Sequence, residues 1–264
     1  MPNNKVATKI IFGNWKMNPL TLKEAEKLFS LVAKNVSQIK NTDKKMEIVI
    51  CPPFIYLEAL SKIRTSKIKL GAQDAFPGDV GAFTGEVSGE MLSGLGAKYV
   101  ILGHSEKRAG GETNNEVNKK IKSALAAGLR PVLCMGEGVR DPEHNYFNFV
   151  KTELEECLNG LNKNLISKVI IAYEPIWAIS STQNRKDATP ADCLEMVIFI
   201  RKILSDKFRD VAGGVRIVYG GSVNEKDAGD FLQKGGVDGL LVGKASLDAK
   251  KFVEIIKICA TLNK

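Results

Sequence analysis

The sequence is poor in the residues that build metal sites and disulfide frameworks. Among its 264 residues are only two histidines and five cysteines, and no two cysteines form a CxxC pair. An odd, scattered set of this kind is typical of reduced thiols in a cytoplasmic protein. We therefore expect no disulfide, no metal site and no other cofactor. The cysteines are Cys51, Cys134, Cys157, Cys193 and Cys259.

Long apolar runs and clustered basic residues are also lacking. No stretch approaches the roughly 20 apolar residues that a membrane helix needs, and the polar segment 1–10 does not resemble a signal peptide. The net charge is +8, but the lysines are spread along the chain without a run or interleaved aromatics. We therefore expect no membrane or nucleic-acid partner, whereas the positive charge favours a small anionic ligand.

What the sequence does contain is a regular alternation of short apolar runs and amphipathic segments. Each run predicts a strand, and the segment after it has helical spacing, with no linker or break in composition. Eight such units in this length predict an α/β fold, a single-domain (β/α)₈ TIM barrel over residues 1–264. The predicted strands are Lys9–Gly13, Glu47–Cys51, Ile68–Gly71, Tyr99–Leu102, Arg130–Cys134, Val169–Tyr173, Arg216–Tyr219 and Gly239–Val242.

The sixth predicted strand ends in a carboxylate followed by a hinge. Glu174 stands where the strand stops at Pro175, and an apolar segment and a polar loop come next. A carboxylate on a rigid element beneath a movable loop is the arrangement of a catalytic base under a lid.

Charged residues follow two other predicted strands. Lys16 comes after the first, as a cation suited to an anionic substrate, and His104 comes after the fourth. A helix start beside His104 would favour its neutral form. Glu106, two residues further on, is placed to orient Lys16.

Glycines at the last two strand ends indicate an anion site. Gly220 and Gly221 precede Ser222, and Gly243 precedes Lys244. Such turns expose backbone N–H groups beside helix starts, where barrels commonly bind phosphate.

At these residues the chain resembles the triosephosphate isomerases along essentially its whole length. Six motifs at the expected strand ends carry the resemblance. They are residues 13–18 (GNWKMN), 81–86 (GAFTGE), 103–108 (GHSEKR), 134–137 (CMGE), 172–179 (AYEPIWAI) and 219–223 (YGGSV).

The resemblance implies an isomerase of glycolysis and gluconeogenesis that acts on a small phosphorylated triose, dihydroxyacetone phosphate or D-glyceraldehyde 3-phosphate, through an enediolate. Glu174 would move the carbon-bound proton, and neutral His104 would polarise the carbonyl and move protons between the oxygens. Lys16 would supply positive charge, Asn14 would help to hold the substrate oxygens, and Glu106 would hold Lys16. A closed, dry site would suppress loss of phosphate from the enediolate.

Phosphate, lid and dimer contacts are implied in the same way. The phosphate would be bound by backbone N–H groups near Ser180, Ser222, Gly243 and Lys244. The long loop 73–88 would insert into a second subunit through Thr84 and Glu86, which predicts a homodimer. Cys134 would pack beneath Glu174. The lid hinges would be Pro175, Ile176 and Trp177 on one side and Lys186, Asp187 and Ala188 on the other.

The chain departs from the family pattern in three places. The lid tip has three extra residues within 180–185 and no glycine, Lys244 stands where the family has a glycine, and Lys107 replaces the usual arginine. The lid is nevertheless expected to close, with Ser180 donating its N–H and with Tyr219 available to hydrogen-bond the lid at Ala188.

Two other kinds of protein remain to be weighed. A Schiff-base aldolase would need a buried strand lysine, and an epimerase commonly needs a metal site, neither of which the sequence suggests. Because the lid sequence departs from the family and the net charge is positive, an alternative is a catalytically impaired barrel that acts as a surface-binding or scaffold protein. A scaffold would not need the catalytic set, which comprises Asn14, Lys16, His104, Glu106 and Glu174.

Overall fold

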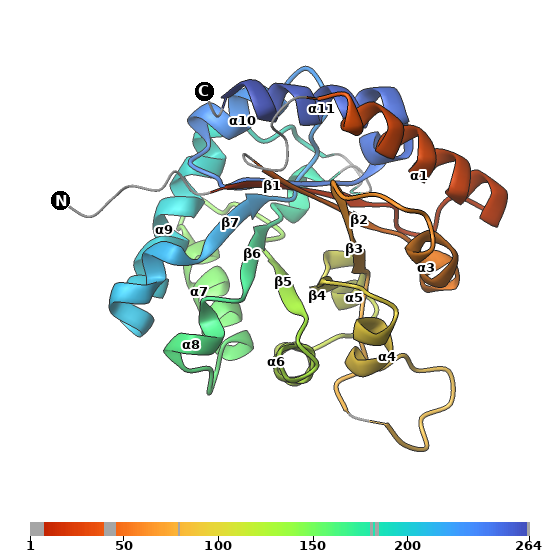
Figure 1. The fold of residues 1–264 in the computed structure, drawn as a ribbon. Helices are drawn as coiled ribbons and strands as arrows, with labels where there is room; N and C mark the ends of the chain where they lie inside the picture. The colour runs from red at the N-terminus through yellow and green to blue at the C-terminus, as the bar shows by residue number, and fades with distance from the viewer. Residues whose placement is uncertain (1–7, 40–45, 79, 180–181, 183–184, 263–264) are drawn as a thin grey trace.

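The protein folds as a closed barrel of eight parallel strands, joined in sequence order from β1 to β8 (Figure 1). The computed structural model describes residues 8–39, 46–78, 80–179, 182 and 185–262. β8 pairs with β1 and closes the ring, which confirms the predicted TIM barrel. The strands are β1 (Lys9–Asn14), β2 (Met46–Cys51), β3 (Ile68–Ala72), β4 (Tyr99–Leu102), β5 (Arg130–Met135), β6 (Ile170–Tyr173), β7 (Arg216–Tyr219) and β8 (Gly239–Val242).

Helices surround the barrel in Figure 1. Thr21 and Thr189 begin two of the longest with complete capping boxes, and Pro190 occupies the first turn after Thr189. The α-helices are α1 (Leu22–Ser37), α3 (Phe54–Ser61), α4 (Gly89–Gly94), α5 (Ser105–Ala109), α6 (Asn114–Ala126), α7 (Asn145–Cys157), α8 (Lys163–Ile166), α9 (Pro190–Phe208), α10 (Ala228–Lys234) and α11 (Ala249–Leu262). The 3₁₀ helices among the described residues are η1 (Ile176–Ala178), η2 (Arg209–Gly214) and η3 (Lys244–Leu247).

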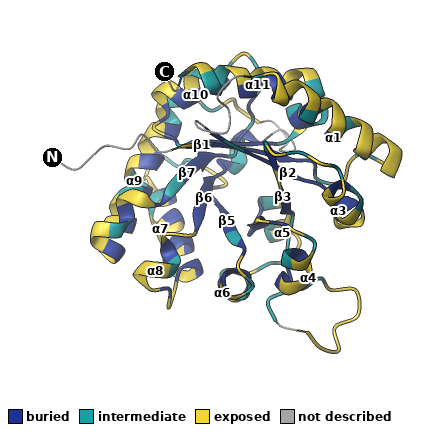
Figure 2. Ribbon diagram, viewed as in Figure 1, coloured by how far each residue is buried: buried dark blue, intermediate teal, exposed yellow. Residues whose placement is uncertain are grey.

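Alternation along the strands divides the core into two layers. In β1, Ile10 and Phe12 belong to a cluster built from every second residue of the strands, inside the barrel. Ile11 belongs to the larger cluster between strands and helices. Figure 2 shows the strands as the buried centre of the molecule. The strand ends are therefore held rigidly, and they fix the positions of the first residues of each loop. Within the described residues, no helix combines the length and apolar character needed to cross a bilayer.

One carboxylate closes the N-terminal end of the barrel. Glu47 of β2 accepts hydrogen bonds from Lys69 Nζ at 2.6 Å, from Arg216 Nη1 at 2.8 Å and from the Tyr99 hydroxyl. Burial alone would raise the pKa of Glu47, but the hydrogen bonds from Lys69 and Tyr99 and the charge of Arg216 outweigh it. The pKa falls to about 2.

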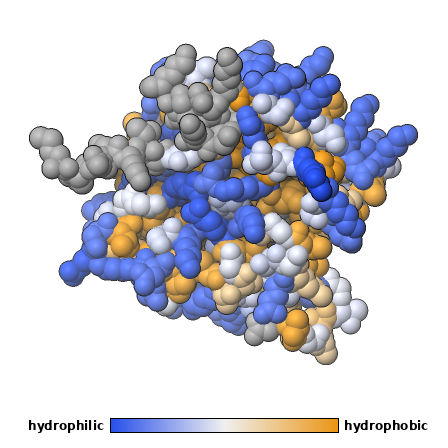
Figure 3. Space-filling model, in the orientation of Figure 1, coloured by the Kyte–Doolittle hydropathy of each residue, from blue (hydrophilic) through white to orange (hydrophobic). Residues whose placement is uncertain are grey.

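The long loop between β3 and α4 extends away from the barrel at the lower right of Figure 1. Its Val80 is 71% exposed and its Phe83 51%. Apolar atoms gather at the same place in the space-filling view of Figure 3. Two further apolar side chains, Met17 and Leu20, are 88% and 87% exposed. Exposed apolar residues of this kind mark a candidate interaction surface.

Candidate active site

A cavity of about 620 Å³ opens at the C-terminal ends of the strands. It brings together seven of the predicted site residues, which come from the ends of five strands. Glu106 lies beside it, while Thr84 and Glu86 are exposed on the long loop. The predicted residues that line the cavity are Asn14, Lys16, His104, Glu174, Ser222, Gly243 and Lys244.

Glu174 is buried at the end of β6, with 2% of its surface exposed. Two glycines make room for it. A Cβ on Gly220 would lie 2.7 Å from the Glu174 Cγ, and one on Gly136 would lie 2.2 Å from its carbonyl oxygen. The Ser105 N–H donates to Oε2 over a long 3.4 Å. The carboxylate is thus dry and weakly hydrogen-bonded, so it retains capacity to accept a proton.

Cys134 lies beneath this carboxylate inside the barrel, as predicted. Burial raises the pKa of the Cys134 thiol, and the charge of Glu174 raises it further. The thiol therefore stays protonated and is unsuited to act as a nucleophile.

His104 caps α5 and turns one ring nitrogen toward Glu174. Its Nδ1 accepts the Glu106 N–H at 3.2 Å, so in the neutral ring the proton is on Nε2. Nε2 lies 3.5 Å from the Glu174 Oε1. A proton donor and a carboxylate therefore lie close enough to contact one small substrate.

Lys16 is held in a strained conformation, with φ at 53°. Its N–H donates to the Asn14 Oδ1 at 3.0 Å, and its ammonium forms a 2.5 Å ion pair with Glu106. Gln73 Nε2 donates to the Lys16 carbonyl at 2.9 Å and to the Cys51 carbonyl at 2.8 Å. Sequence reasoning missed Gln73, because a side chain that binds distant backbone carbonyls leaves no motif.

The far side of the cavity is built from backbone and cations. Ser222 follows β7, and Lys244 begins η3 after Gly243, outside the positive-φ region, so its N–H is available at a helix start. Arg185, from the lengthened lid tip, lines the same cavity and pairs with Asp187 at 3.3 Å. The sequence showed the insertion but not this placement. Ser180, the remaining predicted phosphate contact, lies outside the described residues.

The two predicted lid hinges meet each other. Within η1, Trp177 offers its carbonyl to the Lys186 N–H at 3.2 Å. The bond expected between Tyr219 and Ala188 is not formed, because the Tyr219 hydroxyl is buried without a partner. Its ring stacks on Phe231 at a centroid distance of 4.0 Å, which turns the hydroxyl over Gly221.

Lys107, which replaces the family arginine, pairs with Asp74 at 2.9 Å at the base of the long loop. Lys120 binds the other oxygen of the same carboxylate at 2.7 Å. An ammonium therefore anchors the loop, although without the planar fork of a guanidinium. Over the part of the chain that the structure describes, no group of three or more His, Cys, Asp or Glu could hold a metal ion.

Comparisons with known proteins agree with this geometry. The family model described as triosephosphate isomerase matches residues 9–259. A triosephosphate isomerase of Dehalococcoides mccartyi (strain CBDB1) is 46% identical over 257 residues, covering 96% of this chain and 97% of the relative. One of Endomicrobium trichonymphae is 42% identical, covering 94% and 97%. The crystal structure of triosephosphate isomerase from Bartonella henselae has a TM-score of 0.81 at 33% identity, covering 95% of this chain and 98% of that one.

Proposed function

Because the chain belongs to the triosephosphate isomerase family, we propose that it interconverts dihydroxyacetone phosphate and D-glyceraldehyde 3-phosphate through an enediolate. One observation carries the proposal. A buried carboxylate, Glu174, lies 3.5 Å from the Nε2 of His104, at a cavity whose wall includes Lys16. Proton abstraction beside a carbonyl needs such a base and such an electrophile.

The proton transfers are set by the atoms that face the cavity. Glu174 takes a proton from the carbon next to the carbonyl, and the electron pair of that C–H bond forms the enediolate. His104 donates a hydrogen bond from Nε2 to the oxygen that gains charge. Proton exchange between the two oxygens through His104 moves the charge, and Glu174 returns the proton to the other carbon. No group is lost, so the reaction is an isomerisation.

Binding depends on the charges around the cavity. Lys16 stabilises the negative enediolate, and Asn14 both holds the Lys16 backbone and presents its amide to the substrate oxygens. Glu106 fixes the Lys16 ammonium. The N–H groups of Ser222, Gly243 and Lys244 bind the phosphate, and Ser180 would complete this set when the lid closes. Asn14, Lys16, His104 and Glu174 line one cavity, which supports an enzyme over the scaffold alternative.

A coupled isomerase assay on the purified protein tests the activity. Glu174→Gln keeps the shape of the side chain but removes the base, so kcat/KM should fall by about a hundredfold to ten-thousandfold. Equal rates for the wild type and Glu174→Gln would end the enzyme proposal. Ser105→Ala leaves the N–H that Glu174 accepts in place and serves as the matched control.

We also infer that the chain works as a homodimer. Exposed apolar residues of the long loop and of the segment after β1 supply a surface that needs a cover, and Thr84 and Glu86 are exposed beside them. Analytical ultracentrifugation should give twice the 28.8 kDa chain mass. Phe83→Asp should shift it toward the monomer, whereas Phe149→Asp, at another exposed phenylalanine, should not. A wild-type monomer at micromolar concentration would refute this inference.

The pathway and compartment complete the proposal. An enzyme with this activity belongs to glycolysis and gluconeogenesis, and we place it in the cytoplasm because its five cysteines are all buried and free. Cell fractionation checks the compartment, and recovery of the chain outside the cytoplasmic fraction would contradict it. The absence of nucleic-acid and membrane partners, and one domain over the whole chain, stay predictions.

A further inference from the structure

One arginine outside the catalytic set uses its whole guanidinium. Arg140, between β5 and α7, is about one-fifth exposed. Nε donates to Glu137 at 3.1 Å, and Nη1 donates to Asp192 at 3.1 Å and Glu195 at 2.7 Å. Nη2 donates to the Tyr173 hydroxyl at 3.3 Å and to the Asp192 carbonyl at 3.1 Å. All five N–H groups of the fork are used, which is more than a solvated surface arginine achieves.

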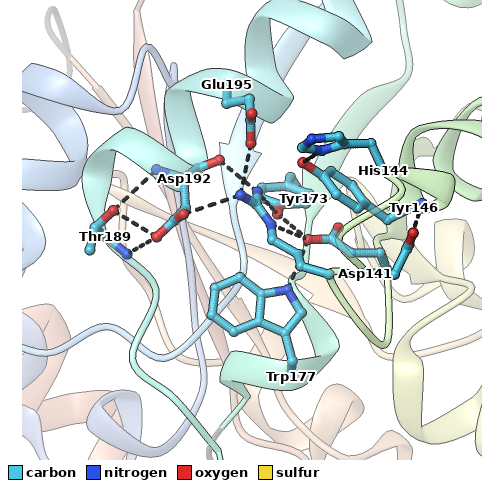
Figure 4. A network of polar contacts seen from close by, with 10 residues as sticks. Asp141, His144, Tyr146, Tyr173, Trp177, Thr189, Asp192 and Glu195 are labelled. Carbon is cyan, nitrogen blue, oxygen red and sulfur yellow. Dashed lines mark hydrogen bonds and ion pairs between the residues drawn. The ribbon is translucent and has the colours of Figure 1, made fainter.

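Through Glu137, this arginine reaches the first end of the lid. Glu137 is 1% exposed, and its Oε1 also accepts the Trp177 indole N–H at 2.8 Å and the Tyr173 hydroxyl at 2.9 Å. The Glu137 carbonyl accepts the Ile176 N–H at 2.9 Å. The Arg140 guanidinium also lies over the Trp177 ring, 5.4 Å from its centre. Figure 4 shows Tyr173 and Trp177 within this network.

Through Asp192, the same arginine reaches the second end of the lid. Asp192 closes the capping box of α9, in which its Oδ2 accepts the Thr189 N–H at 2.8 Å. Thr189 directly follows the hinge 186–188. The Lys186 N–H in turn donates to the Trp177 carbonyl. One planar cation therefore joins the supports of both hinges. Figure 4 shows the bonds between Thr189 and Asp192 at the start of α9.

We propose that Arg140 is a positioning residue that holds the two ends of the lid at a fixed separation and so sets how completely the lid closes over the reacting groups. It touches no substrate and acts through Glu137 and Asp192. The proposal deepens the isomerase assignment and rests on it. A lid whose ends drift apart admits water to the enediolate, which then loses phosphate instead of being reprotonated.

The chemistry explains why an arginine is used here. Without the cation, Glu137 would be a buried carboxylate without a countercharge, and its hold on Trp177 would have to change. A lysine would restore one charge and up to three donors, but not a flat fork that reaches two carboxylates and a phenol together. Arg140→Lys should therefore recover only part of what Arg140→Met loses.

The test compares Arg140→Met and Arg140→Lys with Arg201→Met. Arg201 also lies on the lid-following helix α9, but it pairs with Asp238 at 2.8 Å and donates to the Val215 carbonyl at 3.2 Å. For Arg140→Met we expect kcat to fall by about tenfold to a hundredfold, KM to change less, and inorganic phosphate release per turnover to rise. Arg201→Met should lower only the melting temperature.

A second readout does not depend on turnover. The chain has two tryptophans, so in a Trp15→Phe background the emission comes from Trp177. Arg140→Met should change the Trp177 emission and its response to added 2-phosphoglycolate, while Arg201→Met should leave both unchanged. A melting-temperature change alone for Arg140→Met, or the same kinetic change in Arg201→Met, would overturn the proposal. An inactive wild type whose Trp177 still responds to the ligand would refute the isomerase assignment instead.

Discussion

A glutamate lies at each end of the barrel, and the two differ in the groups that surround their carboxylates. At the N-terminal end, Glu47 is surrounded by Lys69, Tyr99 and Arg216, and its pKa falls to about 2. At the C-terminal end, Glu174 is more deeply buried, yet its backbone hydrogen bond from Ser105 is long at 3.4 Å. The first carboxylate is stabilised as an anion by three close donors, whereas the second lies at a cavity that a substrate can enter.

The same contrast holds for the cations. Arg216 makes a 2.8 Å bond to Glu47 and is only 11% exposed, so its charge stabilises a carboxylate within the fold. Lys16 pairs with Glu106, but it keeps a strained backbone and lines an open cavity. Burial alone therefore does not mark a functional charge. A charge that lines a substrate-sized cavity is the better mark of function.

The largest effect is expected from exchanging the two cations for neutral side chains. Lys16→Met should lower kcat/KM by about a hundredfold to a thousandfold, because the enediolate loses its countercharge. Its melting temperature should change little, since the Glu106 partner is half exposed. Arg216→Met should leave the rate unchanged and lower the free energy of unfolding by about 1–3 kcal/mol. A stable, active Lys16→Met would erase the contrast between the ends.

A smaller effect, visible in pH dependence, is expected for Glu47→Gln. The pKa of Glu47 is lowered by folding from 4.5 to about 2, so the stabilisation is complete above pH 4.5 and is lost as pH falls toward 2. The carboxylate is partly solvated, so the loss on substitution should be about 1–2 kcal/mol at pH 7.

Denaturant unfolding of the wild type and Glu47→Gln from pH 7 to pH 2 measures this effect. The difference in unfolding free energy should shrink between pH 4.5 and 2, while kcat stays unchanged at pH 7. A difference that stays constant over this range would show that Glu47 acts through packing and not through its charge.

The sequence was sufficient for the parts of the molecule that obey local rules. Short apolar runs predicted the eight strands, because a parallel strand buried on both faces shows as an uninterrupted apolar segment. The start of α9 at Thr189 and Pro190 follows such a rule, because capping depends on near neighbours. The cluster of site residues could be inferred from the fold, because all eight strand ends meet at one face.

Contacts that depend on distant backbone or on side-chain orientation were not predictable. Gln73 binds the backbone carbonyls of Lys16 and Cys51. Every residue has such a carbonyl, so the sequence does not show which one is bound. In the sequence Arg140 is an ordinary loop arginine, because its partners Glu137, Asp192 and Tyr173 come from separate parts of the chain. The Tyr219 hydroxyl was assigned a lid partner that it does not have, because its ring packs on Phe231.

The smallest effect we predict concerns Arg185, which the lengthened lid brings to the cavity wall. Within the described residues it pairs with Asp187, which is 81% exposed, so the guanidinium remains largely available to an anionic substrate. Arg185→Ala should raise KM by about twofold to fivefold at low salt with little change in kcat, and the difference should fade as salt screens the charge. Arg64→Ala removes the same charge from an exposed site outside the cavity and controls for net charge. Equal KM values for the two variants would mean that Arg185 contributes only to the overall field, and the lid insertion would then have no role in substrate binding through this side chain.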